Sequence, residues 1–273
     1  MRRRRVCRAS RLLSKFGRFL RDRLYILSIS RLKERFDMKH INKKVMLAAA
    51  GLILLLGYIS ISSADPSETS DAEGIYTNAE QAVFYVRALR SDGTIKDTGT
   101  GFMIRPDGVA LTAYHVVKEA DQVACVMNDA SVMACPVIAY DVASDTAVLK
   151  ISPEPAAASE KQRSFPYLPL RASAVKHGEK VFAIGYPMKD TKIVTEGVVN
   201  APRAAVNGRD RILMSADLAS GMSGGPLLDR YGKAAGILSG SLRTMNGIHL
   251  AVDAEAVNRV LKQANLSASG KEE

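Results

Sequence analysis

The sequence of 273 residues has no internal repeat, no long low-complexity tract, no P-loop and no His or Cys cluster at metal-ligand spacing. Because 47% of its residues are hydrophobic and 24% are charged, an intrinsically disordered or collagen-like chain is excluded. Without a P-loop or a metal-ligand pattern, neither a metal ion nor another cofactor is expected.

Basic residues are scarce beyond the N-terminal segment, although the formal net charge is +10. Residues 1–44 contain 16 of the 38 Lys and Arg and 3 of the 28 Asp and Glu, which leaves residues 65–273 with 22 basic and 25 acidic side chains. A nucleic-acid-binding domain carries its basic face on the folded part of the chain. Nucleic acid is therefore excluded as the partner of residues 65–273. This part of the chain is long enough to fold around one sizeable core or two small ones.

Charged residues are absent from Val45 to Ala64. This apolar segment follows the basic residues 1–44 and precedes a polar one, and that order is typical of a secretory signal peptide, cleaved here after Ala64, with Met38 as a second candidate start. An uncleaved membrane anchor is the first alternative, because the apolar run of 17 residues is near the lower limit for a span. An organellar transit peptide is the second alternative. All three take the domain out of the cytosol. The predicted location is extracytoplasmic, either periplasmic or secreted, with a membrane anchor as the alternative, and this leader is the only expected membrane contact.

Cysteine is rare, and only Cys125 and Cys135 lie beyond the leader. The turn-forming residues 128–131 separate two apolar runs around them, which predicts a hairpin with the two cysteines almost opposite each other. In an oxidising compartment they would form a disulfide. Two buried free thiols are the alternative.

Short alternating β-branched runs follow one another along residues 79–265, the predicted folded domain. With so little helical pattern, they favour antiparallel barrels or a sandwich. Asp253 is the expected N-cap of a terminal amphipathic helix that ends near Ala264. Residues 65–78 are predicted to be a polar tether, residues 155–161 a surface loop and residues 266–273 a tail. The predicted strands are 82–89, 99–104, 109–113, 122–127, 133–140, 146–151, 180–184, 193–199, 211–216, 226–228, 233–239 and 248–252.

Three separated segments carry the residue types of acyl-transfer chemistry. His115 follows a strand, Asp145 precedes one, and Ser223 lies in a glycine-rich turn, which is one of the known chain orders of a catalytic triad. An imidazole can take the proton of a serine hydroxyl, and a buried carboxylate fixes the imidazole tautomer. The glycines around Ser223 allow a sharp turn that aims the amides of Gly221 and Ser223 at a developing oxyanion.

Other assignments fit these motifs less well. Residues 221–225 also match the Gly-x-Ser-x-Gly elbow of α/β-hydrolases, but that fold needs an acid and a histidine after the serine. Only Asp229 and His249 follow it, in a segment that looks mostly β, so this interpretation is rejected. Asp141 competes with Asp145, but no unbroken strand follows it. His40 lies in the leader, and His177 and His249 are interpreted as structural.

Five motifs between about Ala82 and Leu261 stand out together. They are Gly99-Thr100-Gly101-Phe102, Leu111-Thr112-Ala113-x-His115, Ser144-Asp145-x-Ala147-Val148-Leu149, Val181-Phe182-Ala183-Ile184-Gly185-Tyr186-Pro187 and Gly221-x-Ser223-Gly224-Gly225-Pro226-Leu227. In these motifs the chain resembles the trypsin-like serine proteases, and within them the bacterial HtrA (Deg) type. This resemblance implies a double six-stranded antiparallel β-barrel with its site in the cleft between the barrels, and endopeptidase activity on polypeptides. It also implies His115 as general base, Asp145 as its orienting acid and Ser223 as nucleophile, with an oxyanion hole from the amides of Gly221 and Ser223.

The sequence departs from the HtrA pattern in several places. It ends about ten residues after the expected terminal helix, so a PDZ domain is not expected, and the oligomeric state stays open. It has no Ile-Val-Gly-Gly-like terminus, which argues against zymogen cleavage. Tyr114 stands where a small or polar residue usually precedes the histidine, and Met222 replaces the common Asn or Asp before the serine.

Substrate preference has two interpretations. Asp217 lies six residues before Ser223, at the offset that holds the basic-residue selector in trypsin, and Ser239, Gly240 and Ser241 would form an open pocket wall. Cleavage after Lys or Arg would follow. Asp217 as a structural carboxylate is the alternative, because HtrA-type enzymes build this loop differently.

The function predicted from the sequence is that of an exported serine endopeptidase acting on exported or misfolded polypeptides. A catalytically silent scaffold with a collapsed oxyanion loop is one alternative, and an esterase with the same triad is another.

Overall fold

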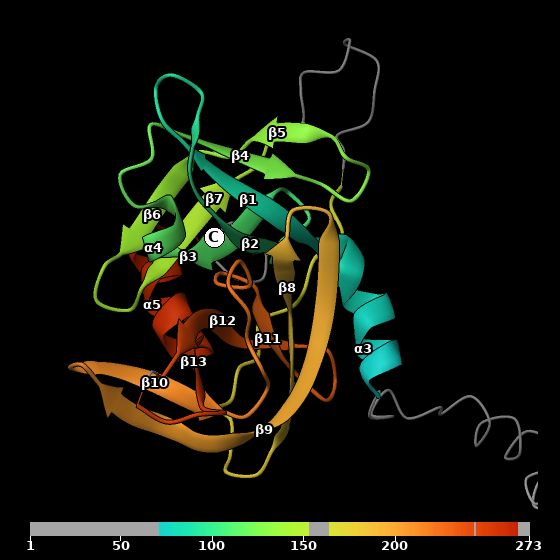
Figure 1. The fold of residues 1–273 in the computed structure, drawn as a ribbon, viewed down its shortest axis with the longest axis vertical. Helices are drawn as coiled ribbons and strands as arrows, with labels where there is room; N and C mark the ends of the chain where they lie inside the picture. The colour runs from blue at the N-terminus through green and yellow to red at the C-terminus, as the bar shows by residue number, and fades with distance from the viewer. Residues whose placement is uncertain (1–70, 153–163, 243, 267–273) are drawn as a thin grey trace, which may run out of the picture. The chain divides into compact units, whose positions relative to one another are not determined.

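β-strands dominate the part of the chain that the computed structural model describes, which is residues 71–152, 164–242 and 244–266 (Figure 1). The predicted leader, the surface loop 155–161 and the tail beyond Leu266 lie outside the described residues. The strands are β1 (Val83–Leu89), β2 (Ile95–Met103), β3 (Val109–Ala113), β4 (Gln122–Val126), β5 (Val132–Ala134), β6 (Val137–Asp141), β7 (Thr146–Lys150), β8 (Lys180–Met188), β9 (Thr191–Val206), β10 (Arg209–Met214), β11 (Pro226–Asp229), β12 (Ala234–Ser241) and β13 (His249–Asp253). The helices are α3 (Ala72–Ala79), η1 (Glu80–Ala82), α4 (Tyr114–Val117) and α5 (Ala254–Gln263).

A seven-stranded antiparallel sheet forms the N-terminal half, in the order β5-β4-β1-β2-β3-β7-β6. Its two edge strands follow each other in the chain and are joined by Cys135 and Pro136 alone. The predicted strand 133–140 is split at this point because proline has no N–H with which to continue the ladder. Counted as one bent strand, β5 and β6 connect the two edges, and the sheet corresponds to the predicted six-stranded barrel.

A closed six-stranded barrel forms the C-terminal half, in the order β10-β13-β12-β11-β8-β9. Figure 1 shows this half in orange below the green strands of the N-terminal half. A turn at residues 229–232 closes its β11–β12 hairpin, where the Gly232 amide donates to the Asp229 carbonyl oxygen at 3.0 Å. The predicted all-β fold of two barrels and a C-terminal helix is confirmed.

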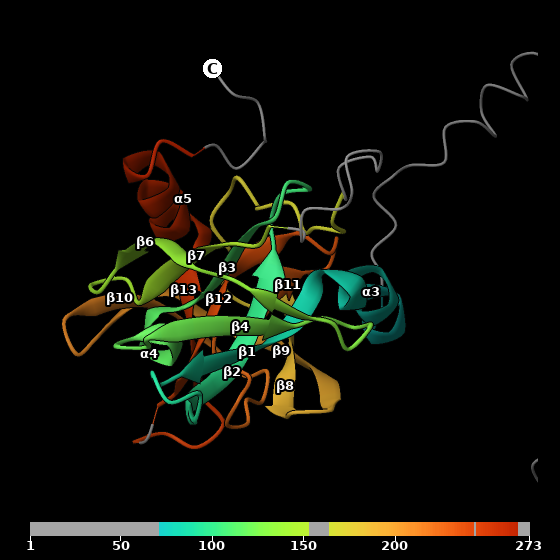
Figure 2. The same ribbon diagram turned by 90° about the horizontal axis from the view of Figure 1, so that it is seen from above.

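Helix α5 begins where the sequence predicts it. The carboxylate of Asp253 accepts a hydrogen bond from the Ala256 amide at 2.6 Å, which is the expected N-cap. Val257, Val260 and Leu261 are buried along one face. The helix contacts β6 and β7 of one half and β12 and β13 of the other, as Figure 2 shows from above, so it packs across the junction between the halves.

The tether predicted over residues 65–78 is wrong in its described part, because α3 occupies most of it. The side chain of Asp71 caps this helix by accepting the Gly74 amide at 2.9 Å. Ile75 and Ala79 are each 1% exposed and belong to the hydrophobic core. A short polar segment with only two buried positions has almost no helical periodicity, so its sequence looks like a linker.

The predicted disulfide joins Cys125 of β4 to Cys135, just beyond β5, with the Cα atoms 6.1 Å apart. Cys125 lies directly opposite Met133 in the β4–β5 pair, so Cys135 is its diagonal neighbour across the hairpin. Diagonal pairs on one sheet face remain within reach of each other. Both cysteines are fully buried.

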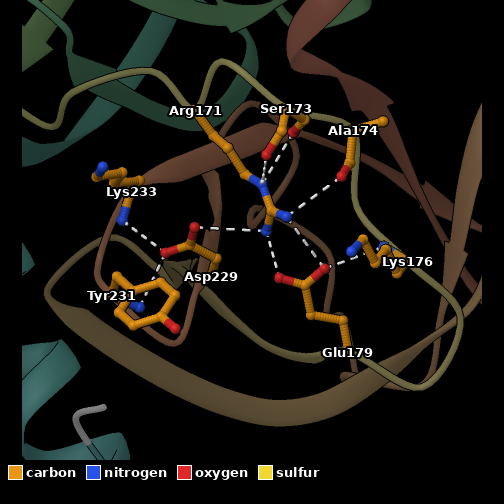
Figure 3. Close-up of polar contacts among 8 residues, drawn as sticks. All are labelled: Arg171, Ser173, Ala174, Lys176, Glu179, Asp229, Tyr231 and Lys233. Atoms are coloured by element: carbon orange, nitrogen blue, oxygen red, sulfur yellow. Dashed lines mark hydrogen bonds and ion pairs between the residues drawn. The ribbon is translucent and has the colours of Figure 1, made fainter. Parts of the chain in front are cut away.

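Arg171 fixes the segment that connects the two halves (Figure 3). Its guanidinium forms a bidentate ion pair with Glu179 and reaches Asp229 Oδ2 at 3.4 Å. The other carboxylate oxygen of Asp229 accepts the amides of Tyr231 and Lys233, which ties the β11–β12 turn to the same cluster. Since these largely buried charges are paired, residues 171–179 have a defined position on the C-terminal barrel.

Candidate active site

The pairing of β3 with β7 brings His115 and Asp145 together. Ala113 at the end of β3 lies opposite Thr146 at the start of β7. The residues just outside this pair therefore meet, and the Tyr114 amide donates to the Asp145 carbonyl oxygen at 3.1 Å. Two residues that are 30 positions apart in the chain become neighbours through strand register alone.

Both oxygens of the Asp145 carboxylate contact His115. Oδ2 lies 2.8 Å from Nδ1 of the imidazole, and Oδ1 accepts the His115 backbone amide at 2.9 Å. The Asp145 side chain is 7% exposed and that of His115 is 42% exposed, so a buried acid orients an accessible imidazole. Because Nδ1 contacts the Asp145 carboxylate, Nε2 is the ring nitrogen that remains available for proton transfer.

The pKa values of the pair move in opposite directions. Burial alone would raise the pKa of Asp145, but hydrogen bonds from His115 and Ser239 outweigh it, and the pKa is lowered. Burial alone would lower the pKa of His115, but the hydrogen bond and charge of Asp145 outweigh it, and the pKa is raised above 6.5. Each group favours the charged form of the other.

Ser239 has a position that the sequence did not predict. Its hydroxyl donates to Asp145 Oδ2 at 2.7 Å, across 94 positions of the chain. The sequence assigned Ser239 to a substrate pocket wall, whereas its hydroxyl supports the acid. No local pattern could have indicated this contact, because it depends on β12 approaching the start of β7.

The turn that carries Ser223 is held between β2 and β12. The Ser223 carbonyl oxygen accepts the Thr100 amide at 2.8 Å, and the Gly224 amide donates to the Leu238 carbonyl oxygen at 2.7 Å. Gly224 has φ +89°, and a Cβ atom there would lie 2.9 Å from the Ala113 amide nitrogen, close to the residues that lead into α4. The turn thus lies against the strand that presents His115.

The hydroxyl of Ser223 is not paired with the imidazole. Among the described residues, the side-chain hydrogen bonds of His115 run to Asp145 alone. Catalytic hydrogen bonds are often long without substrate and shorten in the complex. The predicted contact between His115 and Asp145 is present. Ser223 is tied to β2, in the half that carries both residues, by the hydrogen bond from the Thr100 amide.

Two amides of the same turn have no acceptor. In the described ranges, the amides of Met222, Gly224 and Gly225 donate backbone hydrogen bonds, but no hydrogen bond uses those of Gly221 or Ser223. These are the two amides that the sequence assigned to an oxyanion hole. Both amides are therefore without a hydrogen-bond acceptor among the described residues.

Two of the residues predicted to bind substrate, Asp217 and Ser241, are linked through His249. His249 Nε2 lies 3.2 Å from Asp217 Oδ1, and the Ser241 hydroxyl lies 2.8 Å from His249 Nδ1. The Asp217 side chain is 85% exposed and that of His249 is 10% exposed. Gly240 lies between Ser239 and Ser241 on β12. A substrate selector would lie at the floor of an enclosed pocket, whereas the Asp217 carboxylate is exposed to solvent beside His249.

The family model described as "Trypsin-like peptidase domain" matches residues 99–237, which is half of the chain and spans His115, Asp145 and Ser223. The chain belongs to the trypsin-like peptidase family. Its similarity to Deg-type members is clear from individual relatives. A probable periplasmic serine endoprotease, DegP-like, of Pseudomonas savastanoi pv. phaseolicola is 34% identical over 178 residues, which covers 63% of this chain and 35% of that protein.

Two further relatives extend the comparison of this trypsin-like peptidase. The serine endoprotease DegS of Escherichia coli is 28% identical over 238 residues, covering 77% of this chain and 65% of DegS. The crystal structure of the serine endoprotease from Yersinia pestis matches with a TM-score of 0.59 and 26% identity, covering 71% of this chain and 66% of that one. The chain spans between about a third and two thirds of the length of these relatives.

The described part of this trypsin-like peptidase contains no helix long and apolar enough to cross a membrane. Nor does that part contain three or more His, Cys, Asp or Glu side chains grouped so that they could share a metal ion.

Proposed function

We propose that this protein is a serine endopeptidase that cleaves polypeptides through an acyl-enzyme, with His115, Asp145 and Ser223 as its triad. The main support is the buried Asp145 carboxylate, which contacts both the ring and the amide of His115. Membership of the trypsin-like peptidase family supports the same class of reaction.

The proposed reaction gives each of these residues a step. Ser223 Oγ attacks the scissile carbonyl carbon while its proton passes to His115 Nε2. Asp145 stabilises the imidazolium that forms. His115 then gives this proton to the leaving amine as the peptide bond breaks, and an ester of Ser223 remains. Water, deprotonated by His115, attacks the ester and releases the new carboxyl terminus, and the proton returns to Ser223.

The amides of Gly221 and Ser223 are the proposed donors to the negatively charged oxygen of the tetrahedral intermediates. Their lack of an acceptor among the described residues supports this role. It also favours the enzyme over a silent scaffold with a collapsed loop. Each such donor contributes roughly 3 kcal/mol of transition-state stabilisation.

The proposed location is extracytoplasmic, and the proposed substrates are exported or misfolded polypeptides. DegP-like relatives whose names include "periplasmic" and the buried disulfide support this location.

Labelling with a fluorophosphonate tests the assignment. The wild type should react and Ser223→Ala should not, and turnover of a peptide library should fall by roughly 10⁴ to 10⁶ in that variant. Asp141→Asn is a control for the choice of acid and should still label, because Asp141 contacts backbone amides of its own turn instead of His115. A wild type that does not label would favour the scaffold, and one that cleaves only esters would favour the esterase.

A further inference from the structure

Thr100 on β2 is a fully buried threonine whose hydroxyl lies at the Ser223 turn. The hydroxyl donates to the Gly221 carbonyl oxygen at 2.8 Å and accepts the Tyr186 amide at 2.9 Å. The Thr100 amide donates to the Ser223 carbonyl oxygen at 2.8 Å. One residue of the N-terminal half therefore holds the carbonyl groups of both residues whose amides have no acceptor.

The turn needs such an anchor because Gly221 must be glycine. Its φ is +92°, and a Cβ atom there would lie 2.4 Å from the Tyr186 carbonyl oxygen. Glycine has more backbone freedom than any other residue, so the residue that fits here is also the one least able to hold its own conformation. Because a peptide unit is planar, the hydrogen bonds to the Gly221 and Ser223 carbonyls fix the units 221–222 and 223–224, which lie on either side of the unit that carries the Ser223 amide.

The donor itself is held firmly. The Thr100 hydroxyl is supported by the Tyr186 amide on β8, and the Tyr186 ring packs edge-on against Tyr85 with centroids 5.9 Å apart. Since the hydroxyl already accepts from an amide, its proton points to the Gly221 carbonyl oxygen.

We propose that Thr100 is a positioning residue whose hydroxyl holds the Gly221–Ser223 turn with both amides directed outward, in the geometry that stabilises the oxyanion. This inference rests on the proposed function for its catalytic consequence. Its structural part, the anchoring of the turn, can be measured without turnover.

Three substitutions at Thr100 separate the hydroxyl from the shape of the side chain. Thr100→Val removes the hydroxyl but keeps the branched shape, and Thr100→Ala removes the hydroxyl and the branched shape. Thr100→Ser keeps the hydroxyl and loses only the methyl group. We expect kcat to fall by about 10- to 100-fold in the Val and Ala variants, less than for loss of an oxyanion donor itself, with KM within about threefold. Thr100→Ser should stay within about threefold of wild-type kcat.

Thr112→Val is the matched control. It also removes one buried hydroxyl that donates to a backbone carbonyl at 2.8 Å, but its acceptor is Thr100 and not the turn. A comparable loss of thermal stability with kcat retained is expected. Equal losses of kcat in Thr112→Val and Thr100→Val would reduce Thr100 to a general packing role and overturn the proposal.

The anchoring is measured by NMR with ¹⁵N-glycine labelling. In Thr100→Val the Gly221 amide resonance should shift or broaden, while Thr100→Ser and Thr112→Val should leave it near its wild-type position. An unchanged Gly221 resonance in Thr100→Val overturns the proposal whatever the activity. A wild type that reacts with no fluorophosphonate, yet shows the Gly221 change in Thr100→Val, would contradict the proposed function and support the anchor.

Discussion

One carboxylate controls the protonation of His115. Asp145 raises the pKa of the imidazole above 6.5 against the effect of burial, while Asp97 adds to the increase and Arg211 opposes it. A protonated imidazole cannot accept the Ser223 proton, so activity is lost as the pH falls through this pKa. The acidic limb of kcat/KM against pH should therefore have its midpoint above 6.5. A midpoint at or below pH 6 would contradict this prediction.

Asp145→Asn should move that limb to lower pH, because the charge that raises the His115 pKa is gone. Its maximal rate should also fall by about 10⁴, since the imidazole loses its orienting partner. Asp97→Asn is the control: this acid also raises the pKa of His115 but is exposed. It should shift the limb slightly downward with the maximal rate retained.

Asp217→Asn tests whether this exposed acid selects substrates. Its only described side-chain contact is with His249, and a contact made by a carboxylate that is 85% exposed to solvent contributes little. We expect the ratio of kcat/KM for substrates with Arg or Lys before the cleaved bond, relative to Leu or Val, to change by less than about threefold. A loss of Arg and Lys preference of tenfold or more would identify Asp217 as the selector.

The sequence predicts the residues of the site that follow or precede a strand, but not those that support them. His115, Asp145 and Ser223 stand in recognisable local patterns of strand and glycine-rich turn. Thr100 and Ser239 act through single hydroxyls across 121 and 94 positions. Such contacts leave no periodicity and no spacing in the chain, because they depend on how two barrels pack.

Secondary-structure elements were predictable where local chemistry determines them. The N-cap Asp253 and three buried positions on one face predict α5, and alternation predicts the strands. Helix α3 was missed because its stability comes from burying Ile75 and Ala79 on strands formed later in the chain. The division between β5 and β6 follows from Pro136, which has no backbone N–H to donate to a neighbouring strand. Proline interrupts a strand only where a neighbouring strand needs that hydrogen bond, and the sequence alone does not show which strands are neighbours.

The Cys125–Cys135 disulfide should stabilise the β4–β5 hairpin without contributing to catalysis. Replacing both cysteines with Ala should lower the free energy of unfolding by on the order of 2 to 4 kcal/mol. Urea denaturation with and without reductant measures this. Reductant should lower the wild-type midpoint toward that of the double variant and leave the double variant unchanged. A wild-type midpoint that does not respond to reductant would indicate two free thiols.

The whole molecule depends on how its two halves are joined. Helix α5 packs on strands of both halves, and Arg171 ties the connecting segment to the C-terminal barrel. In Figure 3 the guanidinium lies between Glu179 and Asp229, whose side chains are 14% and 3% exposed. Removing the cation would leave two largely buried carboxylates without their positive partner, which costs far more than the loss of a surface ion pair.

Arg171→Met should therefore lower the free energy of unfolding by about 3 to 5 kcal/mol near pH 7. The loss should shrink in acid. Burial raises the pKa of Glu179, but Arg171 outweighs it and holds the pKa below its usual 4.5. A carboxyl with a lowered pKa stabilises the fold above pH 4.5 and loses this contribution as the pH falls through the folded-state pKa. Tm measured from pH 7 down to pH 3.5 for both proteins tests the trend.

Arg259→Met is the matched control for this cluster. It also breaks an arginine–glutamate pair, but Arg259 and Glu255 are 56% and 70% exposed on α5. Its cost should be about 0.5 kcal/mol or less and nearly independent of pH. If the two variants lost similar stability, burial of the Arg171 cluster would have no energetic consequence. If only Arg171→Met were destabilised, but equally at every pH, its loss would come from packing and not from the unpaired carboxylates.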